Sequence, residues 1–329
     1  TVRLDLIGHV LTRKNTDRYD IVIIQSGATL TLIVSNTGNL QHKFNAGEGG
    51  WTKAADDATG EGIVTVTGGV IYGDAGSSID TRGIKILDGK LEMYGGNIAG
   101  IGNGYTLAYG GGVYVSDKCT FNMYGGSIKG CYVFSDGGGV YVAAGGTFTM
   151  GGDSTIEGCN ARSGGGVYNA GTFTMSGNSC IRNCIYRSGA GSGGVHSAGT
   201  FNLNGGSVVR SLSGYNDIKE LVGICNAGNY SIISEGTFTG NFSNDSGGTI
   251  SGGEFQGEVE NCATINGGKF SVGKVRNAGG NIINGTFDVP VTNDGGWIKG
   301  GTFYDTVTND RSIIEGGEFH STVNNTGEI

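Results

Sequence analysis

Apolar and polar residues alternate in short runs along most of the chain, and glycine separates one run from the next. In the run GGGVYV that begins at Gly110, Val113 and Val115 fall on one face and Tyr114 falls on the other. This two-residue period is typical of a β-strand with one buried face. The pattern therefore predicts many short strands joined by tight turns.

The runs belong to a repeated block. Blocks begin at Gly110, Gly137 and Gly164, which gives a period of 27 residues, and a looser block begins at Gly193. Each block contains three strand-like runs, and in the first block their apolar positions are Val113 and Val115, Phe121 and Met123, and Ile128. Stacking each run on its counterpart predicts an all-β, single-stranded, right-handed parallel β-helix. It would have three short strands per coil and a rise of about 4.8 Å per coil.

In the last third of the chain the repeat shortens to 16 residues. The recurring anchors are Phe255, Phe270, Phe287, Phe303 and Phe319, with Asn261, Asn277, Asn293, Asn309 and Asn325. We expect these residues to form structural ladders in a narrow coil without loops. Stacked asparagine amides would bond to each other and to turn backbone, each bond contributing about 1 kcal/mol. A polar binding row is the functional alternative.

The spacing divides the chain into three continuous parts. Residues 1–62 are expected to form N-terminal coils with a capping loop between Gln41 and Gly62, which would cover the first coil. Residues 63–223 form the long-coil section with a looped edge, and residues 224–329 form the short-coil section. Because the last repeat stops partway, we expect the natural protein to continue.

Composition narrows the classes of protein and partner. With 68 Gly but 1 Pro in 329 residues, collagen is excluded, and 37% hydrophobic against 15% charged residues argues against disorder. The net charge of −8 comes with scattered Lys and Arg, which gives nucleic-acid binding little support. No apolar run reaches the ~18–20 residues of a membrane span, so no transmembrane segment is expected in this fragment. The histidines are far apart, and neither a metal site nor a cofactor is expected.

Several repeat residues carry a family resemblance. LDLIGHVL at Leu4–Leu11, GATLTL at Gly27–Leu32 and the GGGVY blocks are similar to repeats of Gly-rich right-handed β-helix proteins. These are surface or secreted proteins of gut bacteria, and autotransporter passenger domains and polymorphic outer-membrane proteins resemble them more distantly. The resemblance covers nearly the whole chain and implies an extracellular or cell-surface bacterial protein. It implies no catalytic residue, since those families include both adhesins and carbohydrate-active proteins.

A row of aromatic residues is the first candidate for binding. Tyr114, Tyr141 and Tyr168 alternate with inward valines in successive coils, and His196 and Cys225 continue the row. Outward aromatic rings could serve as a platform for sugars. The structural alternative is that tyrosine is simply a favoured strand residue that shields the sheet.

Insertions provide the second candidate, because every one falls after the same strand and hence on one edge of the solenoid. The binding candidates on this edge are Tyr105, Tyr109, Tyr132, Arg162, Tyr186, Arg187 and Tyr215. Together with the tyrosine row they could line a groove. The alternative is that loops are polar and variable without any function.

No pair of acidic residues occupies matching positions in adjacent coils, as a glycosidase-like site would need. The weak catalytic candidates are Asp136, Asp217 and Glu220. Cys131, Cys159 and Cys184 share one position in consecutive coils, close enough for a disulfide. Free buried thiols are the alternative that the odd number of cysteines favours.

The leading hypothesis is an adhesin-like, glycan-binding module at the cell surface. Its partner would be a host or dietary glycan, or a host surface protein. Two alternatives stay open: a polysaccharide lyase or glycoside hydrolase acting at the looped edge, and a structural stalk of a larger surface protein.

Overall fold

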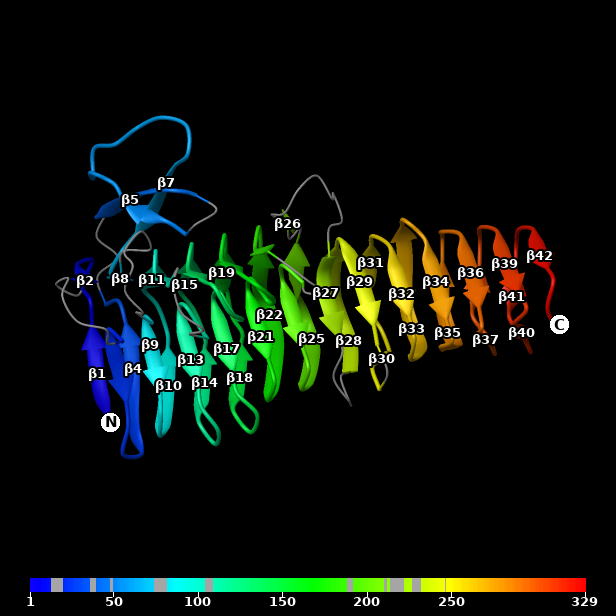
Figure 1. The fold of residues 1–329 in the computed structure, drawn as a ribbon, viewed down its shortest axis with the longest axis horizontal. Helices are drawn as coiled ribbons and strands as arrows, with labels where there is room; N and C mark the ends of the chain where they lie inside the picture. Colours follow the sequence, from blue (N-terminus) through cyan, green and yellow to red (C-terminus); the bar gives the residue numbers. More distant parts are fainter. Residues whose placement is uncertain are drawn as a thin grey trace.

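The computed structural model describes all residues of the chain except 13–19, 36–39, 48–49, 74–81, 104–108, 188–191, 210–211, 214–221, 227–231 and 246. The described regular structure is entirely β, and coil after coil is stacked into a long rod with the termini at opposite ends (Figure 1). The described strands of successive coils pair in parallel. The fold is therefore a parallel β-helix, as the repeats predict.

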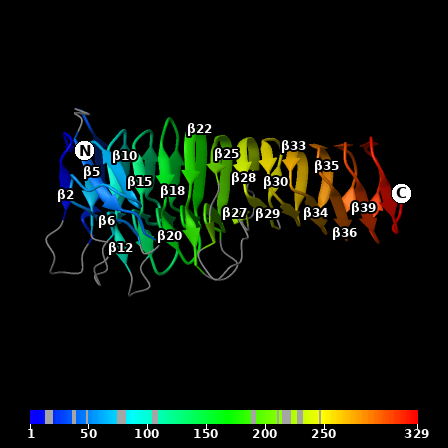
Figure 2. The same cartoon turned by 90° about the horizontal axis from the view of Figure 1, so that it is seen from above.

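One face of the rod is a 13-stranded sheet, which we call the tyrosine sheet. Its strands are β3 (Val22–Ile24), β9 (Ile84–Ile86), β13 (Val113–Val115), β17 (Val140–Val142), β21 (Val167–Asn169), β24 (Val195–Ser197), β27 (Val222–Asn226), β29 (Asn241–Asn244), β32 (Val259–Asn261), β34 (Val275–Ala278), β36 (Val291–Asp294), β39 (Val307–Asp310) and β42 (Val323–Asn325). Their inward side chains are mostly valine and asparagine, and this sheet runs the length of the rod (Figures 1 and 2).

A second, 21-stranded sheet, the wide sheet, receives two strand segments from each coil. The first segments lie in β1 (Val2–Asp5), β4 (Ala28–Ile33), β10 (Gly89–Met93), β14 (Thr120–Met123), β18 (Thr147–Met150), β30 (Thr249–Ile250), β37 (Trp297–Ile298) and β40 (Ile313–Ile314). The second segments lie in β2 (Val10–Thr12), β8 (Val70–Tyr72), β11 (Asn97–Ala99), β15 (Ser127–Lys129), β19 (Thr155–Glu157), β31 (Glu254–Gln256), β38 (Thr302–Phe303) and β41 (Glu318–Phe319). Longer strands span both segments: β22 (Thr172–Arg182), β25 (Thr200–Val209), β28 (Ile232–Thr239), β33 (Thr264–Val272) and β35 (Asn281–Phe287).

The long coils contain a further short strand that the sequence pattern does not predict. These two-residue strands pair into a five-stranded sheet, the edge sheet, along the edge that carries the insertions. They are β12 (Gly102–Asn103), β16 (Tyr132–Val133), β20 (Asn160–Ala161), β23 (Ile185–Tyr186) and β26 (Leu212–Ser213). Part of the expected looped edge is thus regular structure, and two-residue strands are too short to show a period.

Two phenylalanine ladders fill the core, and they lie in different columns. Phe121, Phe148, Phe173 and Phe201 stack at ring-centroid distances of 4.8–5.0 Å on the first strand segments. The second ladder stacks on the second segments at 4.7–4.9 Å, and it comprises Phe238, Phe255, Phe270, Phe287, Phe303 and Phe319. Its first member pairs with Val208, which continues the isoleucine column of the long coils. The short coils therefore omit the first phenylalanine position and use phenylalanine where the long coils use isoleucine.

The asparagine ladder lies inside the rod. From Asn244 to Asn325, each amide donates to the side-chain oxygen of the asparagine in the next coil at 2.7 Å. Asn261, Asn277, Asn293 and Asn309 are fully buried, and their amides also bond to turn carbonyls. These contacts occupy the amides with structural bonds and keep them away from any external ligand.

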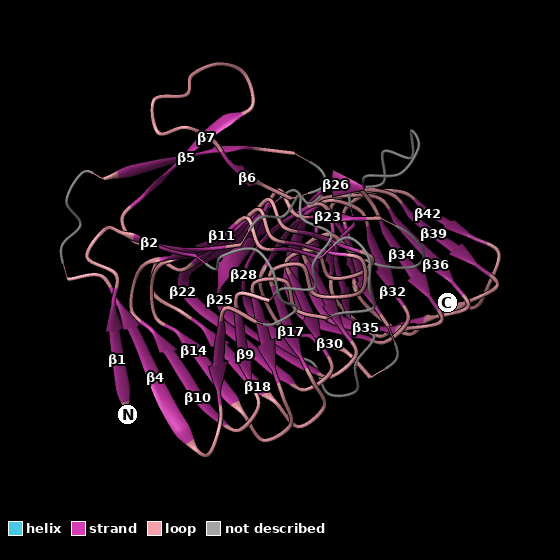
Figure 3. Cartoon of the chain, turned by 60° about the vertical axis from the view of Figure 1, so that its left-hand side comes forward, coloured by secondary structure: helices cyan, strands magenta, loops and turns pink. Residues whose placement is uncertain are grey.

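The segment expected to cap the first coil forms an antiparallel insert instead. It consists of β5 (Gln41–Asn45), β6 (Thr52–Lys53) and β7 (Ile63–Thr67) and lies above the N-terminal coils in Figures 1 and 3. Its Trp51 packs with Phe44 against Ala99 of the coils, and the Trp51 amide donates to the Gly130 carbonyl at 2.8 Å. The insert thus covers the side of the rod, because stacked glycines there leave room for an indole ring.

Candidate functional site

The outward face of the tyrosine sheet carries a continuous aromatic stack. Tyr114 pairs in register with Tyr141, Tyr141 with Tyr168, and Tyr168 with His196. Successive ring centroids are 5.4, 5.2 and 5.0 Å apart, and the interplanar angles are 2°, 1° and 13°. Parallel in-register pairing places identical side chains one above another, so the stack follows from the repeat itself. We call these four residues the tyrosine row.

The geometry changes what the tyrosine row can offer to a ligand. Each internal ring has a neighbour on both faces, and the Arg82 guanidinium lies 5.3 Å from the Tyr114 ring centroid at the first end. Arg82 is held there by Asp20 at 3.1 Å and by the Tyr109 carbonyl at 2.8 Å. The ring faces from Tyr114 to Tyr168 are therefore covered, and these rings present edges and polar atoms to solvent. A sugar could not stack flat on Tyr141 as the sequence hypothesis supposed.

Two further candidates lie beside the row. The Tyr109 ring lies 4.7 Å from the Tyr141 ring and is tilted by 41°, so it covers part of an edge. Arg162 donates two hydrogen bonds to Asp136, at 3.0 Å from Nε and 2.7 Å from Nη2. The Asp136 carboxylate is nearly buried, whereas the Arg162 side chain is 56% exposed. Of this pair, the guanidinium is the part that an incoming ligand can reach.

Burial shifts the pKa of three members of the row. It raises the pKa of Tyr141 to about 12, and the neighbouring tyrosines and Asp136 act in the same direction. Burial also raises the pKa of Tyr168 and lowers that of His196, the latter against the opposing effect of Asp136 and Asp245. At neutral pH, Tyr141 and Tyr168 therefore keep their protons, and His196 is neutral. The face offers uncharged hydrogen-bonding groups at intervals of one coil.

The edge sheet holds two other candidates in a structural contact. Tyr132 is buried at 6% exposure, and the Arg187 guanidinium lies 4.3 Å from its ring centroid. Arg187 also donates to the Tyr132 hydroxyl at 2.5 Å, which links coils two turns apart. Tyr186 is half-buried in β23. Tyr132 is thus a packing residue in this arrangement, and Tyr105, Tyr215, Asp217 and Glu220 lie outside the described residues.

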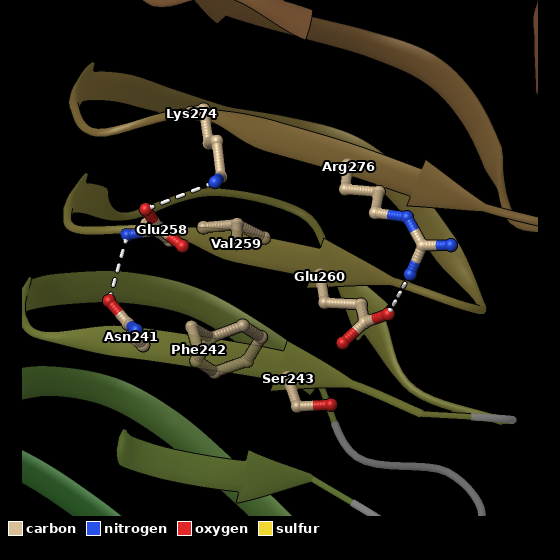
Figure 4. Close-up of a pocket in the computed structure, with 8 residues that line it drawn as sticks. All are labelled: Asn241, Phe242, Ser243, Glu258, Val259, Glu260, Lys274 and Arg276. Carbon is tan, nitrogen blue, oxygen red and sulfur yellow. Dashed lines mark hydrogen bonds and ion pairs between the residues drawn. The ribbon is translucent and has the colours of Figure 1, made fainter. Parts of the chain in front are cut away.

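The outward column of the tyrosine sheet continues beyond the row into the short coils. Past β27 it passes through Ser243, Glu260 and Arg276, which pair in register in successive coils. Here the surface is hollowed by a pocket of about 270 Å³, lined by Asn241, Phe242, Ser243, Glu258, Val259, Glu260, Lys274 and Arg276 (Figure 4). In this section the sequence predicts only structural ladders in a narrow coil without loops. The pocket arises from differences between the side chains of neighbouring coils, and the repeat period of the sequence does not reveal such differences.

Ion pairs organise the pocket. Lys274 lies 3.3 Å from Glu258, and Arg276 lies 2.6 Å from Glu260 (Figure 4). Arg276 also lies 2.6 Å from Asp294. The Asn241 side chain accepts from the Glu258 amide at 3.2 Å. The lining therefore presents fixed donors and acceptors of both signs, whereas the side chains of Phe242 and Val259 are almost fully buried.

The cysteine row is internal. Cys131, Cys159 and Cys184 are free thiols and fully buried, and burial raises the pKa of Cys159 and Cys184 well above the usual range. Their Sγ atoms lie near backbone carbonyls, at 3.3–3.5 Å for the nearest. They pack as small apolar side chains and cannot act on a ligand at the surface.

Comparison with known proteins adds no functional residue. No protein-family profile, no curated protein and no solved structure matches this chain. Within the described ranges, no three His, Cys, Asp or Glu side chains are grouped to hold a metal ion. Among the same residues there is no helix long and apolar enough to cross a membrane.

Proposed function

We propose that this chain is a glycan-binding module of an extracellular bacterial surface protein, and that the outward face of the tyrosine sheet is its binding surface. The observation that carries the proposal is the tyrosine row, whose rings repeat every 5.0–5.4 Å along a rigid sheet. A glycan chain is itself a repeat of hydroxyl-rich rings. A surface with regularly spaced hydrogen-bonding groups can engage several sugar units of one chain at once.

The chemistry of the face suits a hydroxyl-rich polymer. Tyr141 and Tyr168 are protonated at neutral pH, so each hydroxyl can donate and accept a hydrogen bond. Arg162 adds an exposed donor beside the row, and the ion-paired pocket between Glu258 and Arg276 continues the same face. Rigid strands hold these groups before binding, which reduces the entropy lost on association.

The test begins with a glycan array probed with the full chain, followed by calorimetric titration of the glycans that bind. Tyr141→Phe with Tyr168→Phe removes two hydroxyls and keeps the ring stack. If each hydroxyl contributes about 1 kcal/mol, affinity falls on the order of tenfold or more. Tyr304→Phe is the matched control, since Tyr304 is 53% exposed on another part of the rod.

Three results bear on the proposal. Loss of affinity in the double variant but not in the control supports the tyrosine row as the binding surface. Unchanged affinity in both variants would move the binding surface elsewhere. The absence of any bound glycan would contradict the proposal and favour a structural stalk.

A further inference from the structure

A second pair of tyrosines stands at a different corner of the rod, where the chain passes from the first to the second segment of the wide sheet. Tyr94 is 54% exposed and Tyr124 is 43% exposed, and their rings stack at 4.9 Å with an angle of 26°. Neither residue belongs to the tyrosine row or to the looped edge. Exposed aromatic side chains on a soluble protein mark candidate contact surfaces.

Among the described residues no further ring stacks on Tyr124 toward the next coil, and the Tyr124 side chain is 43% exposed. The Gly151 amide donates to the Met123 carbonyl at 2.9 Å, just as the Tyr124 amide donates to the Met93 carbonyl at 2.8 Å. Gly151 is therefore the counterpart of Tyr124, and it has no side chain to cover the ring. The internal rings of the tyrosine row are closed by a neighbour on each side, whereas this ring has a free face.

Polar groups stand beside the open face because the next two turns are longer. Three residues separate Met123 from Ser127, but four separate Met150 from Thr155 and Met175 from Cys180. The extra residue lengthens each connection between the two strand segments, and Asp153 and Asn178 in these connections are exposed.

Hydrogen bonds fix this polar pair. The Asn178 side chain donates to Asp153 at 3.1 Å, and the Asn178 backbone amide donates to the Gly152 carbonyl at 3.0 Å. Gly152 itself lies directly over Tyr124, since a Cβ on it would come within 2.3 Å of the Tyr124 carbonyl oxygen. A carboxylate and an amide are thus held one and two coils beyond the open ring.

We propose that this corner, the Tyr124 shelf, binds one neutral pyranose unit of a glycan. The shelf comprises Tyr94, Tyr124, Gly151, Asp153 and Asn178. The C–H face of the sugar packs on the free face of Tyr124, and its hydroxyls bond to Asp153 and Asn178. An aromatic face with a few oriented polar groups is the usual make-up of a small-ligand site. The exposed carboxylate and the net charge of −8 disfavour an anionic uronic acid.

This inference rests on the proposed glycan-binding function and adds a second contact surface to it. The probes are soluble hexasaccharides of β-linked glucose, xylose and mannose, with oligogalacturonate as the anionic comparison. Each is titrated calorimetrically against the wild-type chain, Tyr124→Ala and Tyr304→Ala. Tyr304 is the matched control because it is also exposed, at 53% against 43% for Tyr124, and stacks on His320 at 4.7 Å in the short coils.

The expected result is a neutral hexasaccharide that binds wild type and Tyr304→Ala equally, and Tyr124→Ala at least fivefold more weakly. Asp153→Ala should weaken the same sugar severalfold, which separates loss of a contact from misfolding of one variant. If a hexasaccharide binds wild type and Tyr124→Ala equally, the shelf is wrong and the proposed function stands. If none binds wild type, the proposed function itself fails and the shelf fails with it. Preference for oligogalacturonate would overturn the assignment to neutral sugars.

Discussion

At the residue scale, the most constrained side chains are those that repeat in the core. The asparagine ladder shows why a single period can specify them. An amide donates and accepts at once, so a column of identical residues satisfies itself along the rod. Asn277, for example, donates to Asn293 and also to the Gly280 carbonyl at 2.9 Å. Each asparagine therefore satisfies hydrogen bonds of the neighbouring asparagines as well as of the turn in its own coil.

Replacing one member should destabilise the protein clearly. Asn293→Ala leaves the Asn309 side-chain oxygen and the Gly296 carbonyl without their donor inside the core. We expect a loss of about 2–3 kcal/mol in the free energy of unfolding, which urea denaturation monitored by circular dichroism would measure. Thr292→Ala, at the adjacent exposed position, should change it by less than about 0.5 kcal/mol. Equal effects of the two substitutions would contradict the role of the ladder.

Tyr141 makes a second residue-scale prediction through its pKa of about 12, against the ordinary 10.0. A raised pKa means that the folded state favours the protonated phenol. The corresponding stability is complete below pH 10.0 and is lost as the pH rises toward 12. Absorbance titration of tyrosinate should show a component near pH 12 that is missing from Tyr141→Phe. If the component that Tyr141→Phe lacks titrates at pH 10.0 instead, the Tyr141 ring is not desolvated.

Sequence reasoning succeeded best for residues whose role follows from local alternation. The outward direction of Tyr114 and the inward direction of Val113 both follow from the two-residue period. The covering of ring faces did not follow, because it depends on how closely identical rings approach across coils. The open face of Tyr124 was also missed, since it depends on a glycine 27 residues later.

At the scale of elements, the antiparallel insert shows how a glycine position can specify docking. Gly100, Gly130 and Gly158 recur at one corner of successive coils, and Trp51 lies against them. A Cβ on Gly130 would come within 2.0 Å of the Trp51 ring, so only glycine fits. No local pattern around residue 51 encodes this contact, which explains why the sequence predicted a cap over the first coil and not an insert on the side of the rod.

Gly130→Ala should therefore release the insert. In a Trp297→Phe background, Trp51 is the sole indole, and its fluorescence should shift to the red as the buried ring becomes exposed. Gly279→Ala is the control for backbone strain, because Gly279 also has a positive φ of 82° but no atom within 4 Å of the added methyl group. A red shift in the control as large as in Gly130→Ala would show that docking is not the cause.

At the scale of the molecule, the rod consists of two kinds of coil joined through one continuous tyrosine sheet. The change of repeat length was predictable because it is a change of period. The shift of the phenylalanine ladder to another column was not predictable. It becomes apparent only from the register between β25 and β28, in which Phe238 does not pair with Phe201. Continuity of the tyrosine sheet across this junction is what places the tyrosine row and the pocket on one face.

The central claim is that this face binds an extended glycan, and a length series tests it most directly. Oligosaccharides of two to eight units, made from the glycan that the array identifies, would be titrated calorimetrically against the full chain. The account predicts that affinity rises with each added unit until the ligand spans the row, and that Tyr141→Phe with Tyr168→Phe reduces this gain. Affinity that is independent of length, or a gain that the double variant leaves unchanged, would contradict it.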